Sequence, residues 1–513
     1  MKITDLELNV DEMPSEFKLF RGEVTADEWS TAAFAIAEDH GRLVTLWGTQ
    51  LSDGTFVLSA VYDIGTLLWL DLPLENASIS YPDISGLFPC AIRMQRSVGD
   101  LLGLEATGAA DSRLWLNHMM WPADYFPLQK VNSGKEEFAD DQVDDYKFVQ
   151  VMGEGVHEIA VGPVHAGIIE PGHFRFSVVG EKTLRLEERL GYTHKGVDKA
   201  FEQFSAVDGY RLAGRMSGDS TVAYSWSYCM GLENIWNWQV PDRASWLRAI
   251  AIERERIANH LGDLGALGND AGFAFGLSQF MRLKENFLRL NKKFFSHRFM
   301  MDYICPGGVE RDIDTEGLDE ILTQCQVFDQ EVRNLQKIYD DHSGLQDRLM
   351  TTGTVTFDVA TKLGLTGMAG RASGIVHDVR VDAPCAPYSK MEVHVSSRET
   401  GDVSARVDVR FDELYESLRL IRHLVDNLPT GAIRTEYVER GPEGCGAGWI
   451  EGWRGGIFTA LYVDSSGQIS RCHIHDPSWQ NWPVIEYAVI GDIVPDFPLI
   501  NKSFNLSYSG HDR

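Results

Sequence analysis

The chain has 513 residues and a formal net charge of −28 at pH 7, with 75 acidic residues against 47 basic ones. A surface this acidic repels phosphate backbones and anionic lipid headgroups, which argues against binding to nucleic acid or directly to a membrane surface. The hydrophobic share of 44% is ordinary for a globular protein, and the length allows two or three domains. Docking to more basic protein subunits stays open.

Nothing in the sequence indicates membrane insertion or secretion. No apolar run approaches the ~20 residues that a membrane-spanning helix needs. The acidic N-terminal segment lacks the hydrophobic core of a signal peptide, so we expect a cytoplasmic chain. The seven cysteines are far apart and form no Cys-x-x-Cys pair, which predicts buried small hydrophobes and no metal site.

Residues 1–130 are expected to form a small α/β domain. Two β-rich runs, 43–51 and 56–62, are separated by Ser-Asp-Gly-Thr, which is a hairpin signal. A third strand is expected at 66–71, and 81–104 has the pattern of a loop followed by a helix.

An acidic stretch at 131–147 is poor in apolar residues and is the expected linker. The remainder, 148–513, is expected to form a mostly helical domain with small β-sheets, so the fold class is α+β. In 243–267, for example, apolar residues recur at three- to four-residue intervals and make one helix face. Helices are expected over 187–300, 315–343 and 411–427, and β-structure over 158–179, 352–395, 457–463 and 469–474.

Short motifs run through both domains in a fixed order. In the second domain they are 162–165 (GPVH), 170–176 (EPGHFRF), 192–196 (YTHKG), 255–261 (ERIANHL), 370–374 (GRASG) and 492–499 (DIVPDFPL). This series resembles the large subunit of group 4 NiFe hydrogenases and the related 49-kDa quinone-site subunit of respiratory complex I. The first domain, with 81–84 (YPDI) and 127–130 (PLQK), resembles the 30-kDa subunit of complex I. The fusion of both resembles the formate hydrogenlyase large subunit.

The resemblance implies a nickel–iron centre held by four thiolates in two Cys-x-x-Cys pairs. Here the positions of the pairs hold Ser217, Ser220, Ser507 and Gly510. Hydroxyl groups are poor replacements for thiolates as ligands of such metals, so a conventional NiFe centre is not expected. Hydrogenase precursors are trimmed after the last Cys motif, and the missing ligands favour a chain made without such an extension.

Candidate chemistry gathers around these emptied positions. His173 lies on a turn that resembles the complex I loop carrying a quinone-headgroup histidine, where a neutral imidazole could donate a hydrogen bond to a quinone carbonyl and pass on a proton. The partner tyrosine of that family corresponds to Gly218, so Tyr224 or Tyr508 is the expected substitute. Glu170 resembles the glutamate that carries protons away from the hydrogenase site. A structural role for His173 and Glu170 is the alternative.

Asp219 lies between two former ligand positions, and the family arrangement would place it near Arg215, Arg371 and Arg454. Either it fills space as the partner of an arginine, or it handles protons or substrate. The candidate catalytic residues are His173, Asp219, Glu170, Arg215 and Tyr224, and the candidate cleft-lining residues are Arg371, Arg454 and Tyr508.

These features predict a soluble-arm subunit of a membrane-anchored, complex I-like or group 4 hydrogenase-related oxidoreductase, active only within the complex. No directly bound cofactor is expected. An iron–sulfur small subunit would hold the cluster, since this chain lacks the cysteines for one, and a quinone or another small molecule would accept the electrons. Ion-translocating membrane subunits would hold the chain on the inner face of the cytoplasmic membrane. The alternatives are a non-catalytic scaffold or coupling subunit and a hydrogenase with atypical ligands.

Overall fold

The computed structural model describes residues 2–74, 79–139, 145–165, 169–436 and 440–513. The first domain is built on a five-stranded sheet in the order β1-β2-β5-β4-β3, in which only β2 and β5 pair in parallel. The expected hairpin is present, with Gln50 opposite Phe56 at its turn. The strands are β1 (Asp11–Glu12), β2 (Leu19–Glu23), β3 (Arg42–Gln50), β4 (Phe56–Asp63) and β5 (Leu67–Leu74).

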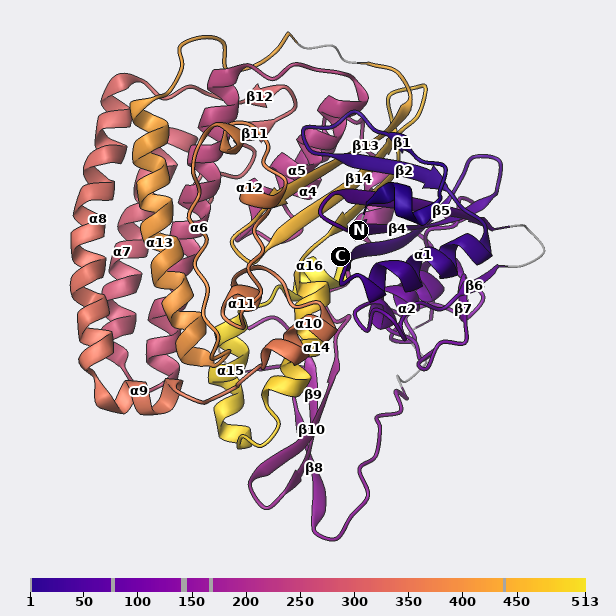
Figure 1. Cartoon of the computed structure of the whole chain (residues 1–513), viewed down its shortest axis with the longest axis horizontal. Helices are drawn as coiled ribbons and strands as arrows, with labels where there is room; N and C mark the ends of the chain where they lie inside the picture. The colour runs from indigo at the N-terminus through magenta and orange to yellow at the C-terminus, as the bar shows by residue number, and fades with distance from the viewer. Residues whose placement is uncertain (1, 75–78, 140–144, 166–168, 437–439) are drawn as a thin grey trace.

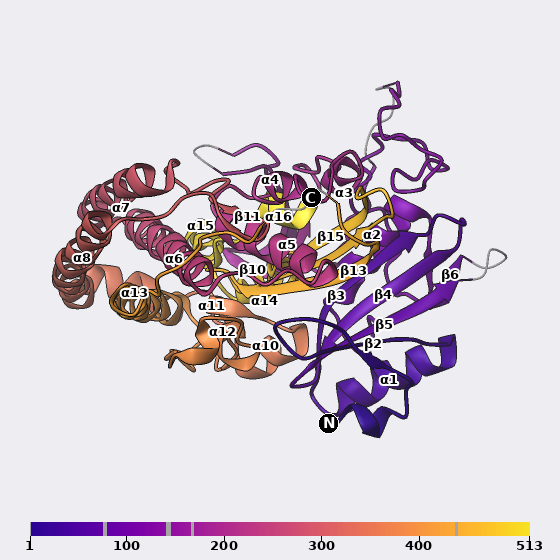
Figure 2. The same cartoon turned by 90° about the horizontal axis from the view of Figure 1, so that it is seen from above.

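Two helices accompany this sheet (Figure 2). Helix α1 (Ala26–Glu38) begins with a capping box, because the Thr25 hydroxyl accepts from the Glu28 amide and the Glu28 carboxylate accepts from the Thr25 amide. Helix α2 (Ala91–Leu102) packs on β3. Around them are the 3₁₀ helix η1 (Ile3–Leu6) and two short paired strands, β6 (Ser80–Pro82) and β7 (Glu105–Thr107).

The second domain opens with a three-stranded antiparallel sheet in the order β10-β9-β8, which projects from the body of the molecule (Figure 1). Its strands are β8 (Val156–Val161), β9 (His173–Val179) and β10 (Lys182–Arg189). Between β7 and β8 the described residues form neither helix nor strand, and the domain boundaries at 130 and 147 stay a prediction.

Long helices form the body of the second domain, and four of them, α6, α7, α8 and α13, lie side by side in Figures 1 and 2. Helix α6 is buried over most of its length, and two of its buried arginines are paired with carboxylates, Arg248 with Glu233 at 2.6 Å and Arg256 with Glu253 at 3.2 Å. The long helices are α5 (Thr221–Ile235), α6 (Asp242–Asp270), α7 (Ala274–Phe295), α8 (Thr315–Asp341) and α13 (Val403–Asp426).

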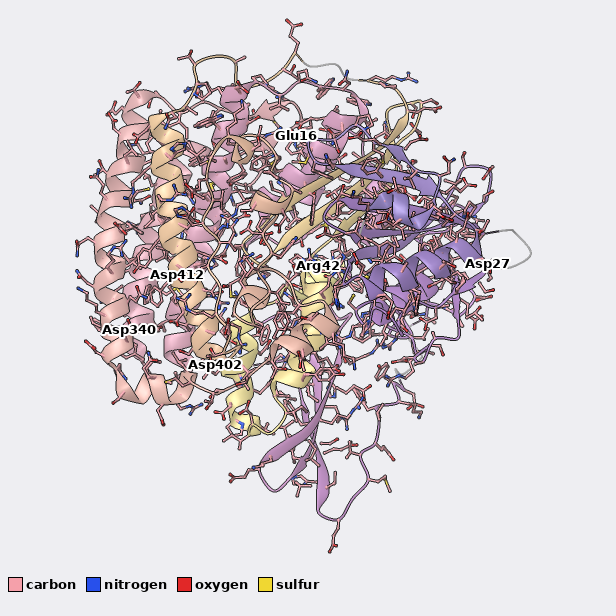
Figure 3. The ribbon with its side chains drawn as sticks, in the orientation of Figure 1. Glu16, Asp27, Arg42, Asp340, Asp402 and Asp412 are labelled. Atoms are coloured by element: carbon pink, nitrogen blue, oxygen red, sulfur yellow. The ribbon has the colours of Figure 1, made fainter. Side chains whose placement is uncertain are left out.

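Helix α13 begins at Asp402, which Figure 3 shows at the lower end of that helix. One oxygen of its carboxylate accepts from the Ala405 amide at 2.8 Å, and the other accepts from the Thr351 amide at 2.8 Å. The residue therefore caps the helix and ties it to the preceding loop.

A second antiparallel sheet, in the order β13-β14-β15, joins the two domains. A side chain at Gly448 would clash with the Ser227 carbonyl oxygen, so the glycine lets α5 pack closely on the sheet. On β15, His473 stacks on Trp47 of the first domain with ring centroids 4.7 Å apart. The two domains therefore share one core. The strands are β13 (Gly444–Glu451), β14 (Gly456–Val463) and β15 (Ile469–His475).

Shorter elements complete the second domain. Among the helices in the described ranges, none is long and apolar enough to cross a bilayer. The predicted β-structure at 352–395 is wrong: this described segment contains α10, α11, α12 and η2. Helix caps determine the local structure here, since the side chains of Thr356 and Asp378 each accept a hydrogen bond from a backbone amide at the start of a helix. The short elements are α3 (Val197–Phe201), α4 (Gly209–Ala213), β11 (Ile304–Cys305), β12 (Gly308–Val309), α9 (Ser343–Leu349), α10 (Phe357–Leu363), α11 (Gly367–Arg371), α12 (Val379–Asp382), η2 (Tyr388–Lys390), α14 (Ser478–Ala488), η3 (Val494–Asp496), α15 (Phe497–Phe504) and α16 (Tyr508–Asp512).

Candidate functional site

The two segments that lack the expected cysteine pairs meet in space. The side-chain oxygens of Ser217 and Ser507, 290 residues apart in sequence, lie 2.9 Å apart and share a hydrogen bond. Ser507 also caps α16, since its hydroxyl accepts from the Gly510 amide at 2.9 Å. We call the cluster of Ser217, Ser220, Ser507, Gly510 and the side chains that fill the space between them the vacated centre.

Tyr224 fills the space beside the fourth position. A Cβ atom on Gly510 would lie 2.5 Å from the Tyr224 hydroxyl. That hydroxyl donates to Oδ2 of Asp476 at 2.5 Å. Burial, followed by the neighbouring Asp476 carboxylate, raises the pKa of Tyr224 well above its ordinary value. The phenol therefore stays protonated and engaged within the protein, and it does not partner His173.

Asp219 is paired with Arg454, as expected. The guanidinium contacts both carboxylate oxygens, at 2.6 and 2.9 Å, and the Ser217 hydroxyl donates to Oδ1 at 2.7 Å. Burial alone would raise the pKa of Asp219, but Arg454 and the Ser217 hydroxyl outweigh it and lower the pKa to about 2. The carboxylate is therefore ionised and held as an ion-pair partner.

The other two arginines expected beside Asp219 lie elsewhere, so that expectation was wrong. Arg215 is exposed and pairs with Asp302 at 2.6 Å. Arg371 is fully buried and pairs with Glu413 at 2.7 Å and Glu451 at 2.9 Å. A buried guanidinium needs compensating carboxylates, and these two acids hold Arg371 away from the vacated centre.

Helix α5 starts directly after Ser220. Its first turn is held by Glu255, the first residue of the motif at 255–261. The carboxylate of Glu255 accepts from the Val222 amide at 2.7 Å and from the Ala223 amide at 3.2 Å. Burial raises the pKa of Glu255 to about 8. These two bonds fix the start of α5, and with it the loop that carries Ser217 and Ser220.

The vacated centre does not fit a nickel–iron group. Its donors are hydroxyl and carboxylate oxygens, which are already hydrogen-bonded to one another, and soft thiolate ligands are missing from all four positions. Across the described ranges, no group of three or more His, Cys, Asp or Glu side chains is arranged to hold a metal ion.

His173 lies at the start of β9 and on the wall of a separate cavity of about 710 Å³, called here the His173 cavity. The first domain contributes Leu116 and Trp121 to its lining, and the second domain contributes His173 and His194. A cavity of this size is in the range that holds small organic ligands. The candidate histidine therefore faces a space that a small molecule can enter.

The two ring nitrogens of His173 differ in their hydrogen bonding. Nδ1 lies 3.2 Å from the Gly162 carbonyl oxygen, while Nε2 is buried and has no hydrogen-bond partner among the described residues. Burial lowers the pKa of His173, which favours the neutral ring. Because a carbonyl only accepts, Nδ1 carries the proton of the neutral ring, and Nε2 is then an acceptor rather than the donor that was expected.

Glu170 and Tyr508 lie beside the turn that carries His173. Exposed Glu170 accepts from the Ser509 amide at 3.3 Å, near the start of α16. Tyr508 is buried, accepts from Asn501 at 3.3 Å and packs next to Gly172. Tyr508 thus supports the turn from behind and does not line the His173 cavity.

Helix α16 connects the vacated centre with the His173 cavity. Ser507 caps its start, while Asp512 near its end accepts from the Thr193 hydroxyl at 2.7 Å. The Asp512 carbonyl oxygen lies 2.8 Å from Nδ1 of His194, a residue of the cavity wall. Of the predicted site residues, Asp219, Arg454 and Tyr224 lie at the vacated centre. Glu170 and Tyr508 lie between the vacated centre and the His173 cavity, and only His173 lines that cavity.

The sequence motifs do not include the aromatic residues that the linker region contributes to the cavity. Tyr146 and Phe148 line it, although they belong to the polar stretch at and just after the expected linker. The signal in the sequence that could have indicated them is a pair of aromatic residues, two positions apart, next to a run of acidic residues.

Family models match two separate parts of the chain. Residues 23–137 match the 30-kDa subunit and residues 270–443 the 49-kDa subunit of respiratory-chain NADH dehydrogenase. The chain thus combines a 30-kDa-like region and a 49-kDa-like region in one polypeptide. The predicted resemblance and the α+β fold class are confirmed.

Characterised relatives span most of this chain. It is 29% identical to formate hydrogenlyase subunit 5 of Escherichia coli (strain K12), over 88% of this chain and 80% of that protein. It is 26% identical to a subunit of the NADH-quinone oxidoreductase of Bacteroides thetaiotaomicron, over 77% of each. A protein of the membrane-bound sulfane sulfur reductase, an archaeal respiratory membrane complex, superposes with a TM-score of 0.67 at 24% identity, over 71% of this chain and all of that one, which shows the shared fold.

Proposed function

We propose that this chain is a peripheral-arm subunit of a complex I-like, membrane-anchored oxidoreductase, in which a quinone or another small acceptor is reduced in the His173 cavity. The observation that carries the proposal is the buried Nε2 of His173, unpartnered among the described residues, at the wall of a cavity of about 710 Å³. Family membership supports the assembly, since the named relatives include subunits of formate hydrogenlyase and of NADH-quinone oxidoreductase.

The electrons come from outside this chain. Its seven cysteines are dispersed and six of them are buried, so a cluster in an iron–sulfur partner subunit is the proposed donor. When bound, that partner supplies electrons one at a time. Membrane-embedded, ion-translocating subunits of the same assembly would keep the chain on the inner face of the cytoplasmic membrane.

His173 is the proposed proton donor. Reduction of a quinone to a hydroquinone consumes two electrons and two protons. With Nδ1 bonded to the Gly162 carbonyl oxygen, an added proton taken from water resides on Nε2 of this cavity-wall residue. Because burial lowers the pKa of His173, the protonated ring is a stronger acid than an ordinary imidazolium and gives this proton more readily to the reduced acceptor. The second proton comes from solvent.

The vacated centre is assigned a supporting role. Its hydroxyls and carboxylates bond to one another, and Asp219 is held by Arg454. This arrangement fixes α16 and the loop before α5, and it offers no exchangeable ligand position. Hydrogen chemistry with atypical ligands is therefore not proposed.

The test compares two histidines in the purified complex. We expect His173→Ala to lower acceptor-dependent turnover by ~10²- to 10⁴-fold, the usual contribution of a general acid. His157→Ala, an exposed residue on the adjacent strand β8, serves as the control and should behave like the wild type. Wild-type turnover in both variants would contradict the proposal and favour a non-catalytic coupling subunit. Stoichiometric nickel in the complex would contradict the assignment of the vacated centre.

A further inference from the structure

The segment at the end of the linker is tied to both domains. From the first domain, Arg113 donates to the Lys147 carbonyl oxygen at 2.6 Å. From the second, Glu187 on β10 accepts from the Val149 amide at 2.7 Å. Residues 145–149 therefore follow a defined path across the junction, although they form neither helix nor strand.

Tyr146 in this segment is held between arginines. The Arg113 guanidinium lies 4.7 Å and the Arg189 guanidinium 4.4 Å from the centre of its ring. Its hydroxyl accepts from Arg96 at 3.0 Å. Next to it, Phe148 packs against Tyr146 with ring centroids 4.9 Å apart. The pair of rings is thus fixed in orientation.

Phe148 contacts the proposed catalytic histidine directly. The ring centroids of Phe148 and His173 lie 5.1 Å apart, and the Arg175 guanidinium lies 4.7 Å from the Phe148 ring. Phe148 therefore packs against His173 from the linker side and also contacts the neighbouring Arg175. Without this ring, water would reach an imidazole that is now only 9% exposed.

Three parts of the chain together enclose the His173 cavity. The first domain gives Trp121, the linker region gives Tyr146 and Phe148, and the second domain gives His173 and Tyr192. Most of these side chains present flat rings, which favour offset stacking or edge contacts with another ring. Such a wall suits a flat conjugated acceptor better than a small inorganic one.

We infer that Phe148 positions His173 and, with Tyr146 behind it, forms the wall that selects a flat aromatic acceptor, so that the linker region completes the acceptor site. The inference rests on the proposed function of the His173 cavity. It assigns the fused linker region a part in substrate specificity, whereas the family motifs around the cavity all lie in the second domain. Phe148 is a positioning and specificity residue; the proton transfer stays with His173.

The pH dependence of turnover gives a readout that a purely structural role would not move. Loss of Phe148 hydrates His173, so its pKa rises towards the ordinary value and the protonated ring persists to higher pH. The alkaline limb of kcat/KM, set by deprotonation of His173, should shift to higher pH. The titratable and charged groups that face His173 from the surrounding elements, and that stay unchanged in this variant, are Asp145, His118, His165, Arg175, Arg189 and His194.

The experiment uses the purified complex, with a short-chain benzoquinone as the flat acceptor and ferricyanide as the small inorganic one. In Phe148→Ala we expect the KM for the benzoquinone to rise roughly two- to tenfold, as the loss of an aromatic contact implies, with ferricyanide reduction unchanged. Phe138→Ala is the matched control, because this linker phenylalanine packs on Tyr125 at 4.8 Å and does not line the cavity.

A second measurement needs no turnover. Diethyl pyrocarbonate should modify His173 several-fold faster in the full chain carrying Phe148→Ala than in the chain carrying Phe138→Ala, as followed by peptide mass spectrometry. If Phe148→Ala lowers the yield of complex, Phe148→Leu keeps the apolar volume and should still raise the KM for the benzoquinone.

The outcomes separate the inference from the proposed function. If His173→Ala abolishes benzoquinone turnover while Phe148→Ala matches Phe138→Ala in KM, pH profile and labelling rate, the inference fails alone. If His173→Ala turns over like the wild type, the proposed function of the cavity fails. Equal loss of benzoquinone and ferricyanide turnover in Phe148→Ala would also overturn the inference, because it would indicate general damage.

Discussion

The vacated centre and the His173 cavity are joined by α16 but differ in how their polar atoms are paired. In the vacated centre the hydroxyls and carboxylates bond to one another, and Tyr224 fills the space beside Gly510. At the cavity wall, the buried Nε2 of His173 has no partner within the described structure. Paired polar atoms stabilise a fold, whereas an unpaired buried one costs free energy unless a ligand completes it. The comparison assigns stability to the first region and chemistry to the second.

The largest expected effect separates the two regions by turnover. His173→Ala should lower acceptor reduction by ~10²- to 10⁴-fold while the unfolding midpoint of the chain changes little. Asp219→Asn, in the vacated centre, should change turnover less than tenfold. A larger loss of turnover in Asp219→Asn than in His173→Ala, measured in the purified complex, would reverse the assignment.

Tyr224→Phe should mainly affect stability. The change removes the hydroxyl that donates to Asp476, so a buried carboxylate oxygen loses this hydrogen bond. The free energy of unfolding should therefore fall by about 1–3 kcal/mol. Tyr508→Phe is the control, since the Tyr508 hydroxyl only accepts a long bond of 3.3 Å from Asn501 and should cost less. Chemical denaturation of the purified chain measures both, and equal losses would argue against a special role for the Tyr224 bond.

Asp219 should make stability depend on pH in the acid range. Its pKa is about 2 in the folded chain against an ordinary 3.8, so its contribution is present above about pH 4 and is lost as the pH falls through 2. Since the side chain is 36% exposed, solvent screening limits this contribution to about 1 kcal/mol. Unfolding midpoints at pH 5 and pH 2.5 should therefore differ less in Asp219→Asn than in the wild type. Identical pH dependence would contradict the ion-pair assignment.

Arg215→Ala should have the smallest effect. The Arg215–Asp302 pair is exposed, with side chains 43% and 37% accessible, and such pairs stabilise a protein by less than about 1 kcal/mol. Thermal unfolding of the isolated chain should be nearly unchanged. Loss of turnover in the assembled complex, with wild-type stability of the chain, would show that Arg215 acts through a partner subunit.

Local patterns were enough to predict much of the fold. Alternating apolar residues and a turn signal predicted the hairpin of β3 and β4, and the three- to four-residue periodicity predicted α6. The segment 352–395 was predicted wrongly because its short helices depend on single caps and on burial against neighbouring elements rather than on a repeated pattern. Helices α14 and α16, C-terminal to β15, were missed because helices buried on most sides lack a polar face.

By itself, the sequence determined the family resemblance, the α+β class, the absence of thiolates at all four expected ligand positions and the candidacy of His173, because these are properties of residue type and order. Only the tertiary structure decided which groups meet. It paired Asp219 with Arg454 and not with Arg215 or Arg371, turned Tyr224 towards Asp476, and brought Phe148 from the linker region onto His173. Contacts between residues far apart in the chain depend on how buried charges and rings find partners, and no local pattern records that choice.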